Sequence, residues 1–205
     1  MLKNRLGIAL ITAGIALTAG RIAWSQSRTY VPVDMPVSLS VGHVRTSDFK
    51  LNLRKLYLIE IEARKALPFD ALNCMLGIKG VISDKCENVP SVLEASWSLS
   101  NAGAVVVSGS STNNRGGDWT NHTIARQLGS FVAEPGRLYR LDVDVSTDGS
   151  SLNQTNPHLK IAVHPQYYEE SALWDIPFFL ASVVLVVLGA TILWKGRRRR
   201  PIPSF

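Results

Sequence analysis

Residues 139–145 read Tyr-Arg-Leu-Asp-Val-Asp-Val, in which apolar and charged side chains alternate without interruption. A period of two is that of a β-strand with one face in a core and the other in water. The same alternation occurs in residues 93–99 and again in residues 159–163. These three segments therefore predict half-buried strands.

Further candidate strands surround these three segments. Residues 49–63 keep apolar side chains in one phase except at Lys55, which predicts a long strand with a bend or bulge near that residue. Shorter candidates are residues 37–41, 104–107 and 124–131. About seven or eight short strands without a helical period predict an all-β domain, a β-sandwich of immunoglobulin-like or jelly-roll type.

A charge-free apolar run begins at Ile176 and ends at Trp194. Its roughly 19 residues cover about 28 Å as a helix, close to the hydrocarbon thickness of a bilayer. Trp174 and Trp194 bracket the run at positions that interfacial aromatic residues favour. The positive-inside rule then predicts a cytoplasmic C-terminus from the basic residues that follow, which are Lys195, Arg197, Arg198, Arg199 and Arg200.

The first apolar segment, residues 6–20, reaches the interfacial aromatic Trp24 only by including Arg21, whose long side chain can extend to the interface. Lys3 and Arg5 precede the segment and keep this end in the cytoplasm. Two interpretations are open: an uncleaved anchor, and a signal peptide with a small-x-small cleavage site at residues 23–25. Both place the following segment outside the cytoplasm.

Small residues recur at four-residue spacing within this first segment, as Ala9 with Ala13 and Ala16 with Gly20. Such pairs let membrane helices approach one another closely. The pattern gives a hypothesis of contact with another helix.

The net charge of +6 raises nucleic acid as a possible partner, but the charges are unevenly distributed. Eight of the 22 basic residues lie in the two ends, whereas all 16 acidic residues lie between Asp34 and Asp175. The middle therefore carries 14 basic against 16 acidic side chains, a balance of about −2, and has no basic stripe for a phosphate backbone. We expect the lipid bilayer, and not nucleic acid, to be the partner of the basic ends.

These patterns divide the chain into four parts. They are an N-terminal transmembrane anchor or signal peptide (1–25), an extracytoplasmic β-sandwich domain (26–172), a transmembrane helix (173–195) and a basic cytoplasmic tail (196–205). We expect a location in the plasma (inner) membrane, with both termini cytoplasmic and the central domain periplasmic or extracellular.

Cys74 and Cys86 are the only cysteines. Both lie in the part expected to face an oxidising compartment, where two thiols this close usually pair. A disulfide would stabilise the irregular segment 67–90 by about 3 kcal/mol in the chain-entropy model. Two buried free thiols are the alternative, whereas a metal site would need further His or Cys residues at ligand spacing.

The candidate binding surface lies after residue 112. It combines hydrogen-bonding groups with an aromatic face, as a polar ligand or a partner protein would require, in Asn113, Asn114, Arg115, Asp118 and Trp119. An ordinary solvated loop is the alternative. The segment lacks the Lys-Ser/Thr of a phosphate-binding loop.

We expect neither a cofactor nor a metal. His158 and His164 flank a candidate strand and would lie roughly 20 Å apart at about 3.3 Å per residue, too far to share a metal ion. No nucleophile with a base and no paired carboxylates stand in a recognisable context, so we do not expect an enzyme.

The function expected from these features is binding. We expect a membrane-anchored accessory or assembly subunit of an envelope complex, whose partner is a neighbouring membrane or envelope protein. One alternative is a carbohydrate-binding module in which Trp119 stacks on a sugar ring, and another is a periplasmic immunity-type protein that protects against an exported toxin.

Overall fold

The computed structural model describes residues 2–78, 86 and 89–198. The chain divides into two compact units. One comprises Met1–Arg28 and Pro165–Phe205 and is called the helical unit below. The other, Thr29–His164, is called the β-domain.

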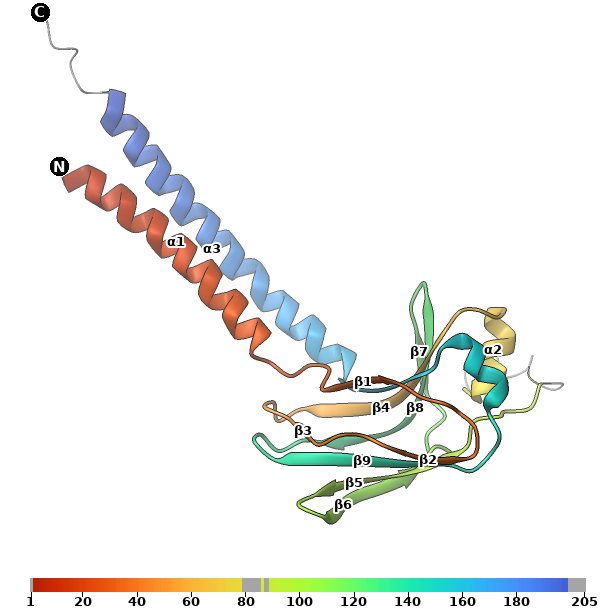
Figure 1. The fold of residues 1–205 in the computed structure, drawn as a ribbon. Helices are drawn as coiled ribbons and strands as arrows, with labels where there is room; N and C mark the ends of the chain where they lie inside the picture. The colour runs from red at the N-terminus through yellow and green to blue at the C-terminus, as the bar shows by residue number, and fades with distance from the viewer. Residues whose placement is uncertain (1, 79–85, 87–88, 199–205) are drawn as a thin grey trace, which may run out of the picture. The chain divides into compact units, whose positions relative to one another are not determined.

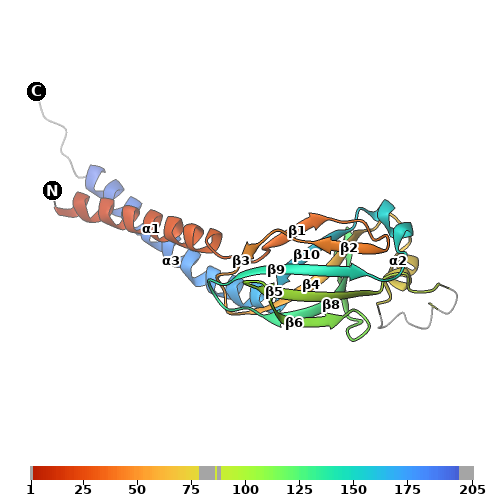
Figure 2. The ribbon, with the colours of Figure 1, turned by 60° about the horizontal axis from the view of Figure 1, so that its bottom comes forward.

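Two antiparallel sheets form the β-domain (Figures 1 and 2). Sheet A has the order β1-β10-β4-β8-β7, and sheet B the order β2-β9-β5-β6, with β3 also paired to β9. Sheet A contains β1 (Val33–Pro36), β4 (Leu56–Arg64), β7 (Gly117–Trp119), β8 (Thr123–Val132) and β10 (His158–Val163). Sheet B contains β2 (Gly42–Arg45), β3 (Phe49–Lys50), β5 (Ala95–Asn101), β6 (Ala104–Ser110) and β9 (Leu138–Val145).

The core lies between the inner faces of the two sheets. In β9 the apolar residues at 139, 141, 143 and 145 are buried, whereas Arg140 and Asp144 face water. The indole Nε1 of Trp97 in sheet B donates to the carbonyl of Leu128 in sheet A (3.0 Å). Alternation thus correctly predicted β5, β9 and β10, and a mostly β-sheet domain is confirmed.

The prediction of one long strand over residues 49–63 is wrong. Residues 49–50 form β3, which pairs with β9 in sheet B, and β4 belongs to sheet A, so the chain crosses between the sheets near Lys55. Leu51 is fully buried at this crossing. The register shift of β4 against β8 falls between Ile59 and Glu60 instead.

Residues 37–41 connect β1 to β2 and are not the predicted strand. Their alternating apolar residues do not share one buried face, because Leu39 is buried while Val41 is 63% exposed. The backbone of Leu39 also bonds outside any sheet: its N–H donates to Asn153 Oδ1 (2.9 Å), and its carbonyl accepts from the N–H of Gly149 (2.8 Å).

The β-domain also contains two short helices that the sequence pattern did not indicate, α2 (Phe69–Leu76) and the 3₁₀ helix η2 (Ser150–Thr155). Helix α2 begins after Pro68 and ends at Gly77, whose φ of +71° is readily adopted by glycine. With eight residues, α2 is too short to show a helical period in the sequence.

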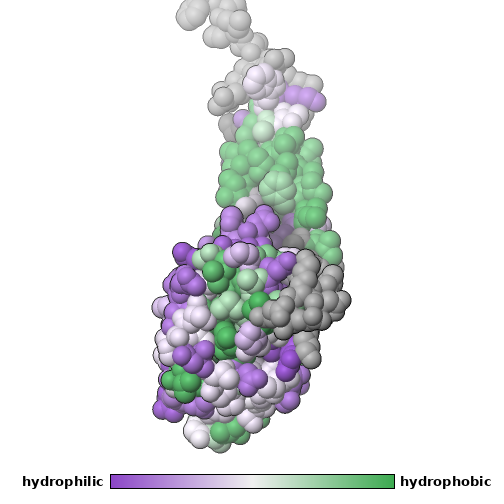
Figure 3. All heavy atoms as spheres, turned by 90° about the vertical axis from the view of Figure 1, so that its right-hand side faces the viewer, coloured by the Kyte–Doolittle hydropathy of each residue, from purple (hydrophilic) through white to green (hydrophobic). Residues whose placement is uncertain are grey.

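The helical unit consists of α1 (Leu2–Gln26) and α3 (Pro165–Arg198). The segments Asn4–Gln26 and Asp175–Lys195 are long and apolar enough to cross a membrane, and apolar residues cover much of the visible surface of this unit (Figure 3). Arg5, Trp24, Trp194 and Lys195 are exposed. Among the other predicted orientation residues, the side chains of Lys3, Trp174, Arg197 and Arg198 and the whole of Arg199 and Arg200 lie outside the described residues.

Trp97 fills a space that a glycine of each sheet leaves open. A Cβ added to Gly129 would overlap the Trp97 indole, and one added to Gly109 would lie 2.8 Å from its Cζ2.

We expect Gly129→Ala to lower the free energy of unfolding by about 2 kcal/mol, because the core is already filled. Urea denaturation of the full-length protein in detergent, followed by circular dichroism, measures the change. The neighbouring Ser130→Ala is the control, and equal stability of the two variants would contradict this packing.

Candidate functional site

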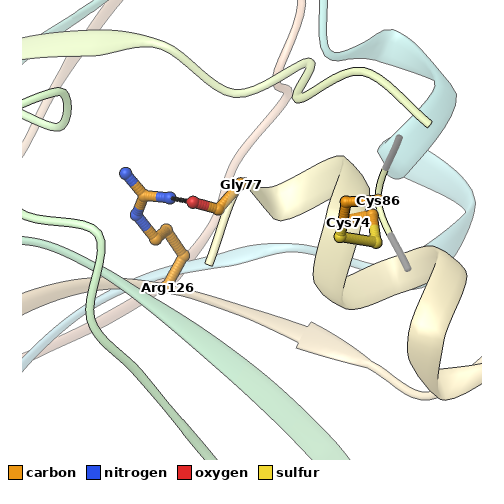
Figure 4. The surroundings of a disulfide bond; sticks show 4 residues. All are labelled: Cys74, Gly77, Cys86 and Arg126. Atoms are coloured by element: carbon orange, nitrogen blue, oxygen red, sulfur yellow. Dashed lines mark hydrogen bonds between the residues drawn. A yellow bond between two sulfur atoms is a disulfide. The ribbon is translucent and has the colours of Figure 1, made fainter. Parts of the chain in front are cut away.

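A buried arginine joins three segments at one end of the β-domain. Arg126 lies on β8 and is 2% exposed. Within the described residues, its guanidinium donates to five backbone carbonyls. They are those of Leu76 (3.0 Å) and Gly77 after α2, Ser111 (2.6 Å) and Asn114 (2.9 Å) between β6 and β7, and Gln127 (3.2 Å). Figure 4 shows the bond to Gly77.

The charge of Arg126 is balanced by these carbonyl dipoles. Burial, with a smaller contribution from the charge of Arg115, lowers the pKa of Arg126 to about 10. The guanidinium therefore stays protonated at neutral pH. Two of its acceptors end α2, where the carbonyls of a helix carry partial negative charge. Arg126 thus supplies donors to carbonyls at the end of α2 and in the connection between β6 and β7.

A disulfide holds α2 from its other side. Cys74 and Cys86 lie at bonding distance, with their Cα atoms 5.3 Å apart, as predicted from the sequence (Figure 4). Cys74 is buried within α2. Helix α2 is therefore joined both to β8, through Arg126, and to Cys86.

An exposed aromatic surface lies where α2 and β7 meet, and we call it the α2–β7 surface. Trp119 is 58% exposed, and its ring meets that of Phe69 edge-on with 6.1 Å between centroids. Lys65 Nζ lies 5.2 Å from the Phe69 centroid and donates to the carbonyl of Thr120 (2.6 Å). The surface thus combines two aromatic rings with a cation.

The predicted surface residues have different roles in the structure. Asn113, Arg115 and Asp118 are exposed, as Trp119 is. Asn114 is half-buried, and its Oδ1 accepts from the N–H of Gly116 (3.0 Å), so this side chain shapes the turn. Asp118 Oδ1 accepts from the N–H of Trp119 (2.7 Å).

Three residues of this site are not among those predicted from the sequence. Phe69 and Lys65 lie about 50 positions before Trp119 in the chain, and only the fold brings them together. The sequence does contain a sign that Arg126 is buried, because this residue lies between Ile124 and Leu128 at a position where the alternation points inward. A charge at an inward position marks a buried group that needs partners.

A second set of charges lies on the outer face of sheet A. Lys160 Nζ donates to Glu62 Oε2 (3.0 Å), and His158 Nδ1 lies 2.6 Å from Asp34 Oδ1. Burial, together with the charges of Asp118 and Glu62, raises the pKa of Glu60 to about 7 against the lowering effect of Lys160. Glu60 therefore titrates near neutral pH. Within the described residues, no group of three or more His, Cys, Asp or Glu is placed to hold a metal ion.

Replacement of Arg126 tests the carbonyl contacts. We expect Arg126→Met to destabilise the β-domain by about 3 kcal/mol, because several buried carbonyls lose their donor. Arg126→Lys should also destabilise, since one ammonium cannot reach segments on two sides. Chemical denaturation of the full-length protein measures both. The control is the exposed Arg115→Met, and an equally small effect of both Met variants would rule out the role assigned to Arg126.

The pKa of Glu60 makes stability depend on pH. Between its ordinary value of 4.5 and about 7, the folded state binds more protons at this site than the unfolded state does, so stability falls as pH rises through that window. We expect Glu60→Gln to be more stable than the parent by about 2 kcal/mol at pH 8, with the difference vanishing near pH 4.5. Unfolding curves at both pH values measure it, with the exposed Glu94→Gln as control. A pH-independent difference would contradict the prediction.

No family model matches the chain, and no curated protein matches it in sequence. Among solved structures, the crystal structure of a protein from Sulfurospirillum deleyianum matches 65% of this chain and 97% of its own, with a TM-score of 0.47 and 8% sequence identity. Similarity at this level does not bear on function.

Proposed function

We propose that this chain is a membrane-anchored extracytoplasmic β-sandwich, of immunoglobulin-like or jelly-roll type, that acts by binding and not by catalysis. Its role would be that of an accessory or assembly subunit of an envelope complex. The observation that carries the proposal is the α2–β7 surface, where the exposed ring of Trp119 meets Phe69 of a helix that a disulfide and Arg126 hold in place. Rigid, exposed aromatic residues beside a cation are typical anchors of protein interfaces.

Three features support the location. Two helices are long and apolar enough to span a bilayer, the cysteine pair suits an oxidising compartment, and basic residues collect at the two chain ends. Together they favour the plasma (inner) membrane, with both termini cytoplasmic and the β-domain periplasmic or extracellular.

The ends of the β-domain favour a partner close to the membrane. The N–H of Val163 donates to the carbonyl of Tyr30 (2.9 Å), so the chain enters and leaves the domain at neighbouring points. A domain attached through both ends to the same bilayer has a short range. A neighbouring membrane or envelope protein therefore fits best as its partner.

Photocrosslinking of the full-length protein in its native membranes tests the binding surface. We expect a photoreactive residue in place of Trp119 to give a reproducible adduct with a membrane or envelope protein, and one in place of Ser96, exposed on β5, to give none. Trp119→Ala should weaken partner capture about tenfold or more, as loss of an aromatic anchor does. Equal adducts at both positions, or none at either, would contradict the proposal.

The exposed indole also favours a carbohydrate-binding module as the second candidate. A glycan array probed with the purified protein separates the two functions. Glycan binding that Trp119→Ala abolishes would replace the protein-binding proposal, and an inert array would leave carbohydrate binding without support. A captured exported toxin would instead indicate the immunity-type alternative.

A further inference from the structure

Helix α1 approaches α3 through glycines spaced seven residues apart. A Cβ added to Gly7 would lie 2.8 Å from Leu193 Cγ, and one added to Gly14 would lie 2.8 Å from Val186 Cγ2. On α3, a Cβ added to Gly189 would lie 2.6 Å from the carbonyl oxygen of Gly7. The two antiparallel backbones are therefore too close for any larger residue at these positions.

Polar side chains of the two helices also meet at this interface. The hydroxyl oxygens of Thr18 and Ser182 lie 2.6 Å apart, and Ser182 Oγ donates to the carbonyl of Gly14 (2.8 Å). Ser182 is buried, at 5% exposure. Closer to the β-domain along the chain, Arg21 forms an ion pair with Asp175. Each of these polar groups finds a partner on the other helix.

The contact residues lie on one face of α1. Gly7, Gly14, Thr18 and Arg21 follow the three- and four-residue spacing of a packed helix seam. The small residues singled out in the sequence lie on the opposite face: Ala9, Ala13, Ala16 and Gly20 are exposed, and a Cβ added to Gly20 would meet no atom within 4 Å. The four-residue pattern therefore did not predict the contact with α3.

We infer that α1 is not a cleaved signal peptide but a permanent half of a two-helix anchor, paired with α3 through these contacts. A signal peptide needs only an apolar segment of sufficient length. Cleavage after residue 25 would remove the partners of Ser182 and Asp175, and unpaired polar groups are costly beside a lipid core. The inference rests on the membrane location proposed above.

The mature N-terminus tests retention. The full-length protein, with a C-terminal tag, is recovered from carbonate-washed membranes and its intact mass is measured. We expect the mass of a chain that still contains α1. A membrane-bound protein that begins near residue 26 would overturn the inference, and with it the cytoplasmic N-terminus, but would leave the membrane location and the binding role standing. Release into the soluble fraction would defeat the proposed location itself, and the inference with it.

The pairing has a separate test. A protease site inserted between Arg28 and Thr29 lets α1 be severed from the purified protein in mild detergent, and the fraction of α1 that stays with the C-terminally tagged remainder is measured. We expect Gly14→Leu to lower that fraction at least about fivefold, because the added side chain cannot fit, and Gly20→Leu, the matched control, to leave it unchanged.

The ion pair can be tested in the same assay. Asp175→Arg should lower the retained fraction of α1, and the exchange Arg21→Asp with Asp175→Arg should restore it, since the charges again oppose each other. Complete dissociation of α1 from the parent protein, or equal retention of the Gly14→Leu and Gly20→Leu variants, would overturn the pairing.

Discussion

One buried guanidinium organises the end of the β-domain that carries its most exposed aromatic surface. A charge removed from water needs compensation from nearby dipoles, and Arg126 finds it in carbonyls of the β6–β7 connection and of the end of α2. Those carbonyls have the converse need, because an irregular backbone cannot satisfy its acceptors by strand pairing. The requirements of the arginine and of the loops are met by the same bonds.

The sequence reveals longer strands with one buried and one exposed face, such as β5, β9 and β10. It fails over residues 49–63 because the inward phase is preserved when the chain passes from sheet B to sheet A, so alternation continues while the strand does not. The predicted strand over residues 37–41 is wrong for a related reason. Leu39 is a buried apolar residue, but its backbone does not pair with a neighbouring strand. The alternation of buried and exposed side chains therefore does not indicate which of the two sheets a residue belongs to.

Half of the candidate site follows from local sequence and half does not. Trp119, Asp118, Arg115 and Asn113 lie within seven positions and are exposed. Phe69 comes from α2 and Arg126 from β8, and their proximity depends on tertiary structure that spacing does not encode. In the helical unit, four-residue spacing of alanines obscured the seven-residue spacing of Gly7 and Gly14 that actually contacts α3. Small residues are abundant on both faces of α1, so their frequency could not indicate the packed one.

The hydrogen bond between Val163 and Tyr30 also gives the β-domain the topology of an insertion. A domain whose two ends emerge side by side replaces a short turn between two segments of a host structure without disturbing its own core. Such a domain can be transferred between different membrane anchors in evolution. Its loops can also diversify while the two helices change under separate constraints.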